Sequence, residues 1–277
     1  MKKYLLPLFL IFALAVPFAL AEQATLPSQD LRRKVFPTLQ AEAKEQTVFI
    51  NSSDEMGWVK EGTRRGQWNL LSNQLYYSAT NWLMPYLETD VWNRFGRKDE
   101  ILTGGSYFKF KDKSFLRAEM GWGLGRLDYI YRWQTTLEYE RPLYKGLSGN
   151  IAGRYLNYPG NDVWIQSPGL RYYFGDHYLG AAFNASQTIS RGPAYWATVK
   201  GHFALHKRVS LDLGTAIGER IYDIQELRAS EQFGYILFSR FDFKICKNVS
   251  VQAGYAYSME RPSFNKQDLD FGVSLKF

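Results

Sequence analysis

The last ten residues, Asp268-Leu269-Asp270-Phe271-Gly272-Val273-Ser274-Leu275-Lys276-Phe277, alternate between two kinds of side chain. The odd-numbered positions are all apolar, whereas the even-numbered positions are acidic, basic, hydroxyl-bearing or glycine. Successive side chains of a β-strand point to opposite faces. The stretch therefore predicts a strand with one apolar and one polar face.

The same period of two recurs toward the N-terminus, for example over residues 249–259, 209–218 and 128–140. Many of these segments have ten or more residues, which exceeds the ~5–6 of an ordinary strand and matches the ~9–11 of a membrane-crossing one. Aromatic residues such as Trp92 and Trp122 crowd the segment ends, as in the girdles of membrane barrels. Open sheet edges are not tolerated in hydrocarbon. We therefore predict an all-β, transmembrane, antiparallel up-and-down β-barrel.

Fourteen segments fit the strand pattern, from a weak one at residues 46–51 to the clear one at residues 268–277. An even number is expected for such a barrel. We predict twelve strands, with fourteen as the alternative. The longest expected connectors are Ser52–Arg65, Glu219–Glu231 and Glu260–Gln267, and all three fall on one side. Because outer loops are longer than periplasmic turns, both ends of the barrel are expected on the periplasmic side.

The composition excludes several other classes of protein. The 277 residues are 17% aromatic, unlike disordered chains. Beyond the first 21 residues, no run approaches the ~20 apolar residues of a spanning helix. A single cysteine, Cys246, excludes an internal disulfide framework and a cysteine-cluster zinc site. The formal charge of +7 is scattered, so lipid head groups are expected as partners and nucleic acid is not.

The N-terminus has the pattern of a secretory signal peptide. A basic start at Met1-Lys2-Lys3 precedes an apolar stretch and an A-x-A site at Ala19-Leu20-Ala21. We predict a cleaved signal peptide over residues 1–21, a periplasmic leader over residues 22–44 and the barrel over residues 45–277.

Residues opposite the apolar face of each strand should point into the lumen. Charges of both signs are interspersed there, which favours internal salt bridges over a single-sign ion filter. The candidate lumen charges are Arg117, Glu119, Arg132, Glu138, Arg154, Arg171, Lys200, Arg240 and Asp242.

No catalytic or metal-binding motif stands out. The most suggestive histidine is His202, which would act as a base with Ser186 on the neighbouring strand, or would simply be a hydrogen-bonded lumen residue. No H-E-x-x-H, EF-hand or G-x-S-x-G motif occurs. We expect no enzyme activity, no cofactor and no metal.

Two resemblances refine this interpretation. The C-terminus resembles the assembly signal of outer-membrane barrels at Asp270, Gly272, Leu275 and Phe277, which implies insertion by the barrel-assembly machinery of a Gram-negative bacterium. Residues from Trp68 to Phe277 also resemble the YaiO family of outer-membrane barrels. The resemblance rests on three motifs, at Arg94-Phe95-Gly96, Gly149–Leu156 and Arg171–Gly175. Barrels related to this family are associated with exopolysaccharide functions.

The sequence therefore predicts a protein of the cell outer membrane, in contact with its lipids including lipopolysaccharide. The first hypothesis is a narrow pore or an envelope component linked to surface polysaccharide. The alternatives are an outer-membrane enzyme acting on lipid or sugar, and a surface receptor that binds through its outer loops.

Overall fold

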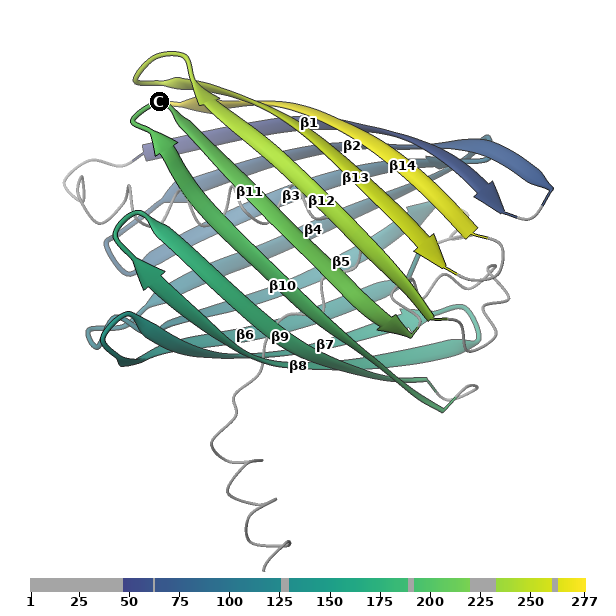
Figure 1. Cartoon of the computed structure of the whole chain (residues 1–277), viewed down its shortest axis with the longest axis horizontal. Coiled ribbons are helices and arrows are strands. Elements are labelled where there is room, and N and C mark those ends of the chain that lie inside the picture. Colours follow the sequence, from purple (N-terminus) through teal and green to yellow (C-terminus); the bar gives the residue numbers. More distant parts are fainter. Residues whose placement is uncertain (1–46, 62, 126–129, 189–191, 220–232, 261–263) are drawn as a thin grey trace, which may run out of the picture.

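The computed structural model describes residues 47–61, 63–125, 130–188, 192–219, 233–260 and 264–277. The expected signal peptide and leader lie outside these residues. Fourteen antiparallel strands form one closed barrel, in which each strand pairs with its neighbours in the sequence (Figure 1). The strands are β1 (Thr47–Glu61), β2 (Arg64–Ser78), β3 (Leu83–Arg94), β4 (Arg97–Lys109), β5 (Phe115–Gly125), β6 (Trp133–Tyr144), β7 (Leu147–Tyr158), β8 (Asn161–Phe174), β9 (His177–Thr188), β10 (Pro193–His206), β11 (Val209–Glu219), β12 (Phe233–Lys244), β13 (Val249–Glu260) and β14 (Phe264–Lys276). Within the described residues, no helix has the length and apolar character needed to cross a membrane.

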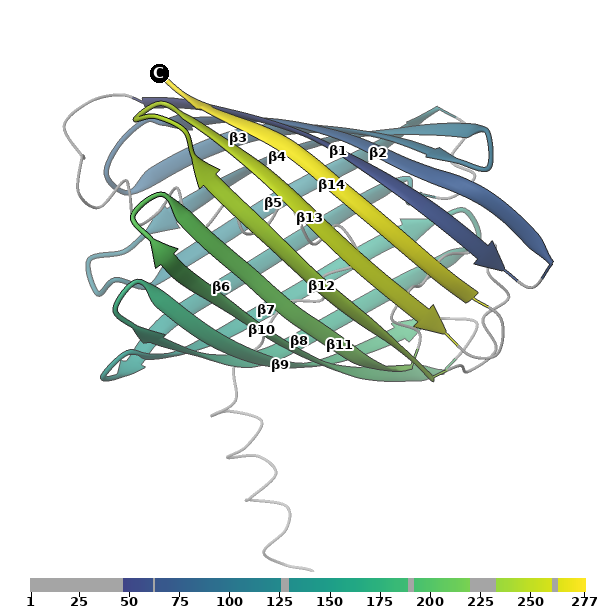
Figure 2. The same ribbon diagram turned by 45° about the horizontal axis from the view of Figure 1, so that its top comes forward.

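The barrel closes between its first and last strands. β1 and β14 lie side by side in both ribbon views (Figures 1 and 2) and pair from Phe49↔Lys276 to Glu61↔Phe264. At the end of this seam, the Phe277 N–H donates to the carbonyl oxygen of Val48 at 2.9 Å, and the Val48 N–H donates back at 3.2 Å. The structure confirms the closed antiparallel barrel and has the larger of the two expected strand numbers.

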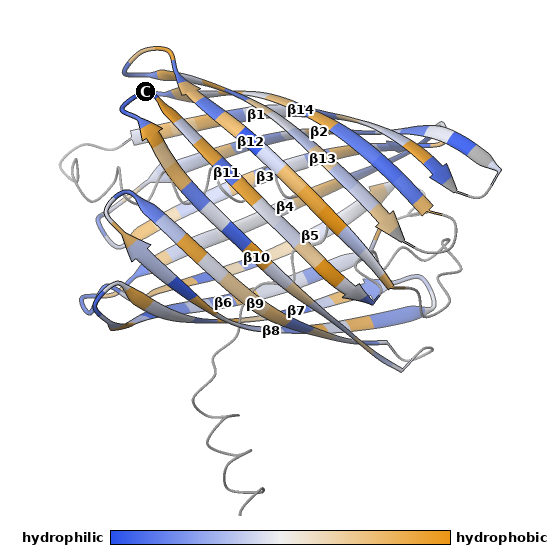
Figure 3. Ribbon diagram, in the orientation of Figure 1, coloured by the Kyte–Doolittle hydropathy of each residue, from blue (hydrophilic) through white to orange (hydrophobic). Residues whose placement is uncertain are grey.

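Each strand alternates between an outward apolar face and an inward, more polar one. Figure 3 shows this as alternating hydrophobic and hydrophilic colour along the strands. On β8, for example, Trp164 is 58% exposed whereas its neighbour Ile165 is 2% exposed. Contact with water is unfavourable for apolar side chains, so their exposure on the outward face indicates that this face contacts lipid.

Two-residue turns join several of the strands. Phe95 and Gly96 have φ angles of 52° and 81°, and Lys145 and Gly146 have 35° and 86°. Positive φ at both central residues is the requirement of a type I′ hairpin turn, whose twist matches that of the flanking strands. These glycines explain why β3–β4 and β6–β7 reverse so tightly.

Two expected outer loops were assigned wrongly. Residues 52–61 continue β1, so the connector after it is far shorter than Ser52–Arg65. β14 begins at Phe264, so Glu260–Gln267 is not a loop along its whole length. In both places polar residues on the outward face, such as Asp54 and Gln267, hide the alternation that marks a strand. The third long connector falls almost wholly in residues 220–232, outside the described part of the chain.

The connector lengths orient the barrel in the membrane. At the end where β1 begins and β14 ends, the connectors are short, such as residues 145–146, 175–176 and 207–208. The longest connector, residues 220–232, joins strands at the opposite end. By the rule that outer loops are longer than periplasmic turns, we expect the end where β1 begins and β14 ends to face the periplasm.

Apolar side chains also gather inside the barrel, at its outer end. They are inward residues from the outer ends of ten strands, and they form one buried cluster that we call the apolar collar. Its strand residues are Val59, Trp68, Leu70, Trp92, Ile101, Leu156, Tyr158, Val163, Ile165, Trp196, Ala216, Ile236 and Phe264. Ile130 and Tyr131, just before β6, pack with them. The collar gives the outer end of the barrel interior an apolar lining, unlike the more polar inward face nearer the other end.

One patch of the lipid-facing surface is polar. Ser52 and Asp54 lie on the outward face of β1, and Asn73 lies beside them on β2. The Ser52 hydroxyl donates to Asn73 Oδ1 at 2.9 Å, and this bond is exposed. Asp54 is exposed too, between Leu71 of β2 and Phe271 of β14 in the register. The apolar band around the barrel is therefore interrupted at β1 and β2.

Candidate functional site: the lumen

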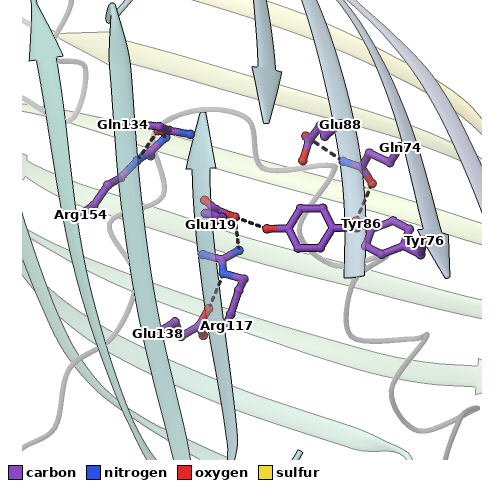
Figure 4. Close-up of polar contacts among 9 residues, drawn as sticks. All are labelled: Gln74, Tyr76, Tyr86, Glu88, Arg117, Glu119, Gln134, Glu138 and Arg154. Atoms are coloured by element: carbon purple, nitrogen blue, oxygen red, sulfur yellow. Dashed lines mark hydrogen bonds and ion pairs between the residues drawn. The ribbon is translucent and has the colours of Figure 1, made fainter. Parts of the chain in front are cut away.

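A network of paired charges lines the wall formed by β3 to β6. Arg117 Nε lies 3.2 Å from Glu138 on β6, and an Arg117 nitrogen lies 3.8 Å from Glu119 on its own strand. The Tyr86 hydroxyl donates to Glu119 from β3 (Figure 4). These side chains point into the lumen from adjacent strands, as alternation at two-residue spacing requires. All three charged groups are almost fully buried, with side-chain exposures of 4% to 6%.

The network extends through amide side chains. Gln74 Nε2 donates to Glu88 at 2.9 Å, and the Tyr76 hydroxyl donates to Gln74 Oε1 at 2.9 Å. Further along the wall, Arg154 Nε on β7 donates to Gln134 Oε1 on the adjacent β6 at 2.9 Å. An amide can accept and donate at once, which lets it join charged groups without adding charge.

Another ion pair joins β6 and β8, nearer the periplasmic end. Arg171 donates to Glu140, and both side chains are at most 5% exposed. The Tyr173 hydroxyl donates to the other oxygen of Glu140 at 2.7 Å. The Glu140 carboxylate is thus satisfied by two donors from the neighbouring part of the wall.

The seam strands hold the most buried of the lysines that the structure describes. Lys266 Nζ, on β14, lies 2.9 Å from Glu55 on β1 and 2.9 Å from Asp268 on β14. Lys266 is 1% exposed as a residue. A charge this deeply buried requires partners, and here one ammonium group serves two carboxylates.

His202 pairs with Asp212 rather than with a serine. Its Nδ1 lies 2.5 Å from Asp212 Oδ1, and Arg240 lies 3.5 Å from the other oxygen of Asp212. Ser186 pairs with Ala194 near the outer end of β9, whereas His202 pairs with Tyr178 near the periplasmic end. Eight residues of strand, roughly 26 Å, therefore separate Ser186 from His202. The structure does not bring this predicted base and nucleophile together.

Eight of the nine candidate lumen charges lie on inward faces of strands, and one does not. Arg132 lies just before β6 and is exposed, because β6 begins at Trp133 and residues 130–132 do not belong to a strand. Those on inward faces are Arg117, Glu119, Glu138, Arg154, Arg171, Lys200, Arg240 and Asp242.

The residues that resemble an assembly signal divide between the two faces of β14. Asp270 is 4% exposed and Gly272 is buried, so both face inward. Leu275 lies on the outward face, and Phe277, just beyond the strand, is 68% exposed. The first two residues of the motif thus face the lumen, and the last two face the lipid.

Sequence reasoning missed several lumen residues. Glu55 was placed in a loop, and Lys266 and Asp268 lay at the edge of one or within it. The signal that could have found them is the pairing of the inward positions across the seam, Glu55↔Asp270 and Gly57↔Asp268, once β1 is extended. The register between two strands cannot be read from the sequence of one strand alone.

The wall from β7 to β9 is different, because its inward polar side chains are mostly small and neutral. Asn150, Ser167, Asn184 and Ser186 are each at most 3% exposed. Four of their side-chain atoms have no hydrogen-bond partner among the described residues: Asn150 Nδ2, Ser167 Oγ, Asn184 Oδ1 and Ser186 Oγ. Buried polar atoms are rarely left unpaired, so this wall has hydrogen-bonding capacity that the described chain does not use.

The described side chains do not suggest a metal centre. In this part of the chain, no group of three or more His, Cys, Asp or Glu is placed to hold a metal ion. What the lumen offers instead is a set of ion pairs, a stretch of neutral hydrogen-bonding groups and an apolar collar at the outer end.

Comparisons with known proteins agree with this architecture. A family model described as "YaiO membrane beta barrel domain" matches residues 55–195. No curated protein matches the chain. Among solved structures, one described as a bacterial polysaccharide outer membrane secretin has a TM-score of 0.60 at 7% identity, covering 83% of this chain and 98% of that one.

Two further solved structures are similar in fold. The CymD monoaromatic hydrocarbon channel has a TM-score of 0.58 at 7% identity, covering 87% of this chain and 91% of that one. The outer membrane protein Omp33 of Acinetobacter baumannii has a TM-score of 0.51 at 9% identity, covering 83% of this chain and 99% of that one. At these identities the similarity shows the fold alone.

Proposed function

The chain is an outer-membrane β-barrel protein of the YaiO membrane beta barrel family, and from this premise we propose that it is of porin or channel type and forms a narrow, hydrated pore without an enzymatic step. The single observation that carries the proposal is the closed barrel of fourteen strands whose inward face carries many polar and charged side chains. A polar inward face is the arrangement of water-filled outer-membrane barrels. A barrel of fourteen strands lies between filled eight-stranded barrels and the wide sixteen-stranded porins, which supports a narrow bore.

We also propose that the solute is a surface polysaccharide or a fragment of one. The support is chemical. Asn150, Ser167, Asn184 and Ser186 present amide and hydroxyl groups, which exchange hydrogen bonds readily with the hydroxyls of a sugar. One of the proteins similar in fold is described as a polysaccharide secretin, which agrees with this class of solute. On this proposal the assembly machinery and lipopolysaccharide remain expected partners.

The enzyme alternative depends on the His202–Asp212 pair, since an acid that orients a histidine is a common arrangement in hydrolases. The separation of Ser186 from His202 removes the nucleophile that the sequence suggested. If the protein were such a hydrolase, it would release fatty acid from phospholipid vesicles, and His202→Ala would abolish this release. We expect no such release from the unaltered protein either.

Single-channel recording tests the pore. The purified, folded protein in a planar bilayer should give stable conductance steps. Ser186→Trp should reduce the step to about half or less, because Ser186 faces the lumen and an indole ring fills part of a narrow bore. Its matched control is Ala185→Trp, since Ala185 is the next residue of β9 and points to lipid.

Two results would contradict the proposal. One is the absence of conductance from protein shown to be folded. The other is an equal effect of the two tryptophan substitutions, which would mean that the current does not pass along the inward face of β9.

A further inference from the structure

The periplasmic rim of the barrel is rich in lysine and arginine. Eight such residues lie in the periplasmic connectors or at the strand ends beside them, and all are half-buried or exposed. Among the described residues, none of the eight forms an ion pair. We call this set the cationic rim: Lys109, Lys111, Lys113, Lys145, Lys207, Arg208, Lys244 and Lys247.

Acidic residues are scarce in the same connectors. Asp112 lies 3.9 Å from Arg141 in an exposed ion pair, so its partner is an arginine outside the cationic rim. Asp176, between β8 and β9, is the other acidic side chain of these connectors. Lys109 and Lys244 lie on the inward faces of β4 and β12, at the mouth of the lumen itself. The mouth therefore has a strong positive excess.

Deeper in the membrane, one side of the lumen has an excess of negative charge. Six carboxylates lie on inward faces of β14, β1, β3 and β5, which lie together in the barrel. We call them the acidic wall: Glu55, Glu88, Asp90, Glu119, Asp268 and Asp270. Lys266 pairs with two of them, and Arg117 lies 3.8 Å from Glu119. The other inward cations at a similar depth lie on strands outside this group: Arg154 on β7, Lys200 on β10 and Arg240 on β12. Asp270 is 4% exposed, and neither of its carboxylate oxygens has a hydrogen-bond partner within the described chain.

The two regions are separated along the pore axis. The acidic wall residues lie four to eight positions from the periplasmic ends of their strands, which is roughly 13–26 Å along the strand. Between the regions lie Arg117 and Arg171, each paired with a glutamate of β6, Glu138 and Glu140 respectively. Charges further apart than the Debye length, about 10 Å at 0.1 M salt, act separately on a passing ion.

We propose that the pore is electrically bipolar, positive at its periplasmic mouth and negative deeper in the lumen. It therefore disfavours small anions and small cations alike and favours neutral or zwitterionic hydrophilic solutes. The rim repels cations, whereas the acidic wall repels anions, so an ion of either sign meets one unfavourable region. A solute without net charge meets neither. This inference rests on the proposed pore and names the class of solute that it admits.

A bipolar pore also conducts unequally in the two directions. When the outer side is at positive potential, cations enter from the end nearer the acidic wall and anions enter from the end with the cationic rim. Each kind of ion then meets attractive charge first, and both accumulate inside the pore. Reversal of the potential depletes both. The current should therefore be larger when the outer side is positive.

Planar-bilayer recording in phosphatidylcholine tests this asymmetry. We expect a current ratio between opposite potentials of at least about 1.5 in 0.1 M KCl, falling to about 1 in 1 M KCl, where the Debye length is about 3 Å. Neutralising five rim cations should remove the asymmetry and shift the reversal potential in a KCl gradient toward cation selectivity. The five changes are Lys111→Gln, Lys113→Gln, Lys207→Gln, Arg208→Gln and Lys247→Gln.

Two further variants separate the rim from a general effect of charge. Asp270→Asn, which keeps the size of the side chain, should also reduce the asymmetry but shift the reversal potential the opposite way. Lys60→Gln with Lys98→Gln is the control, because both residues are outward-facing and lie at the outer end. The control pair should retain the asymmetry.

Vesicle swelling tests the class of solute. Glucose should enter faster than glucuronate, which is anionic, and faster than glucosamine, which is cationic, although the three have similar sizes. Raising the salt to 1 M should bring the three rates together, because it screens both regions.

The outcomes distinguish this inference from the proposed function. Symmetric current at 0.1 M KCl, or equal entry of the three sugars at low salt, would leave a pore and overturn its bipolar character. An asymmetry that survives the five rim substitutions would also overturn it. The absence of both conductance and swelling, from folded protein, would contradict the pore itself.

Discussion

The buried lysine of the seam offers a direct test of the energetics of the lumen. Lys266 is 1% exposed and lies 2.9 Å from each of two carboxylates, whose side chains are 7% exposed. Lys266→Met removes the ammonium group and keeps most of the volume. Glu55 and Asp268 would then be buried without their shared cation. Breaking a buried ion pair from one side typically costs about 3–5 kcal/mol, so we expect a loss of that size in the free energy of unfolding.

A second ion pair in the same barrel provides the matched control. Lys98 Nζ lies 2.6 Å from Glu100, but these side chains are 62% and 46% exposed. Exposed pairs are worth about 0–1 kcal/mol, so Lys98→Met should change the free energy of unfolding by no more than that. The two substitutions are chemically identical and differ in burial.

The assay is urea unfolding of the protein in lipid vesicles, followed by the fluorescence of its eight tryptophans. The double variant Lys266→Met with Glu55→Gln should recover part of the loss, because it removes one of the stranded carboxylates. Equal losses from Lys266→Met and Lys98→Met would refute the reasoning, since burial would then make no difference to the value of the pair.

Three further predictions concern the turns and the seam. Gly96→Ala places a side chain at a φ of 81° and should lower the free energy of unfolding by about 1–2 kcal/mol, measured by the same urea assay. Hydrogen bonds from Ser114 hold the pKa of Asp112 below its usual 3.8, so ionised Asp112 favours the folded turn above that pH and ceases to do so as the pH falls below it. Ser114→Ala should raise this pKa, as measured by NMR titration, and an unchanged pKa would contradict the assignment. Asn51→Cys with Ser274→Cys, in a background without the native cysteine, should form a disulfide across the seam, visible by mass spectrometry, because the two residues are register partners.

The barrel was predictable because its lipid face leaves a regular trace in the sequence. Strands such as β11 and β13 carry an apolar residue at nearly every second position, and their bounds lie close to the expected ones. β1 lacked this trace beyond residue 51. Its outward positions include Ser52, Asp54 and Lys60, so the rule that identifies a lipid-facing strand did not apply to it.

The lumen was less predictable than the strands. Alternation shows which residues face inward, and it placed Arg117 and Glu138 on inward faces. It does not show that these two would lie 3.2 Å apart, because that depends on the register between β5 and β6. The same limit applies to His202, whose partner Asp212 is fixed by the pairing of β10 with β11.

The polar patch on β1 and β2 has a consequence for the membrane around the barrel. Acyl chains have no hydrogen bonds to offer Ser52, Asp54 and Asn73, so we expect water and head groups to approach the barrel there and the bilayer to be locally thinner. Most of the exposed large side chains elsewhere on the outward face are apolar, and beside them the lipids should keep their ordinary thickness. The membrane around the barrel should therefore be thinner on one side of it than on the other.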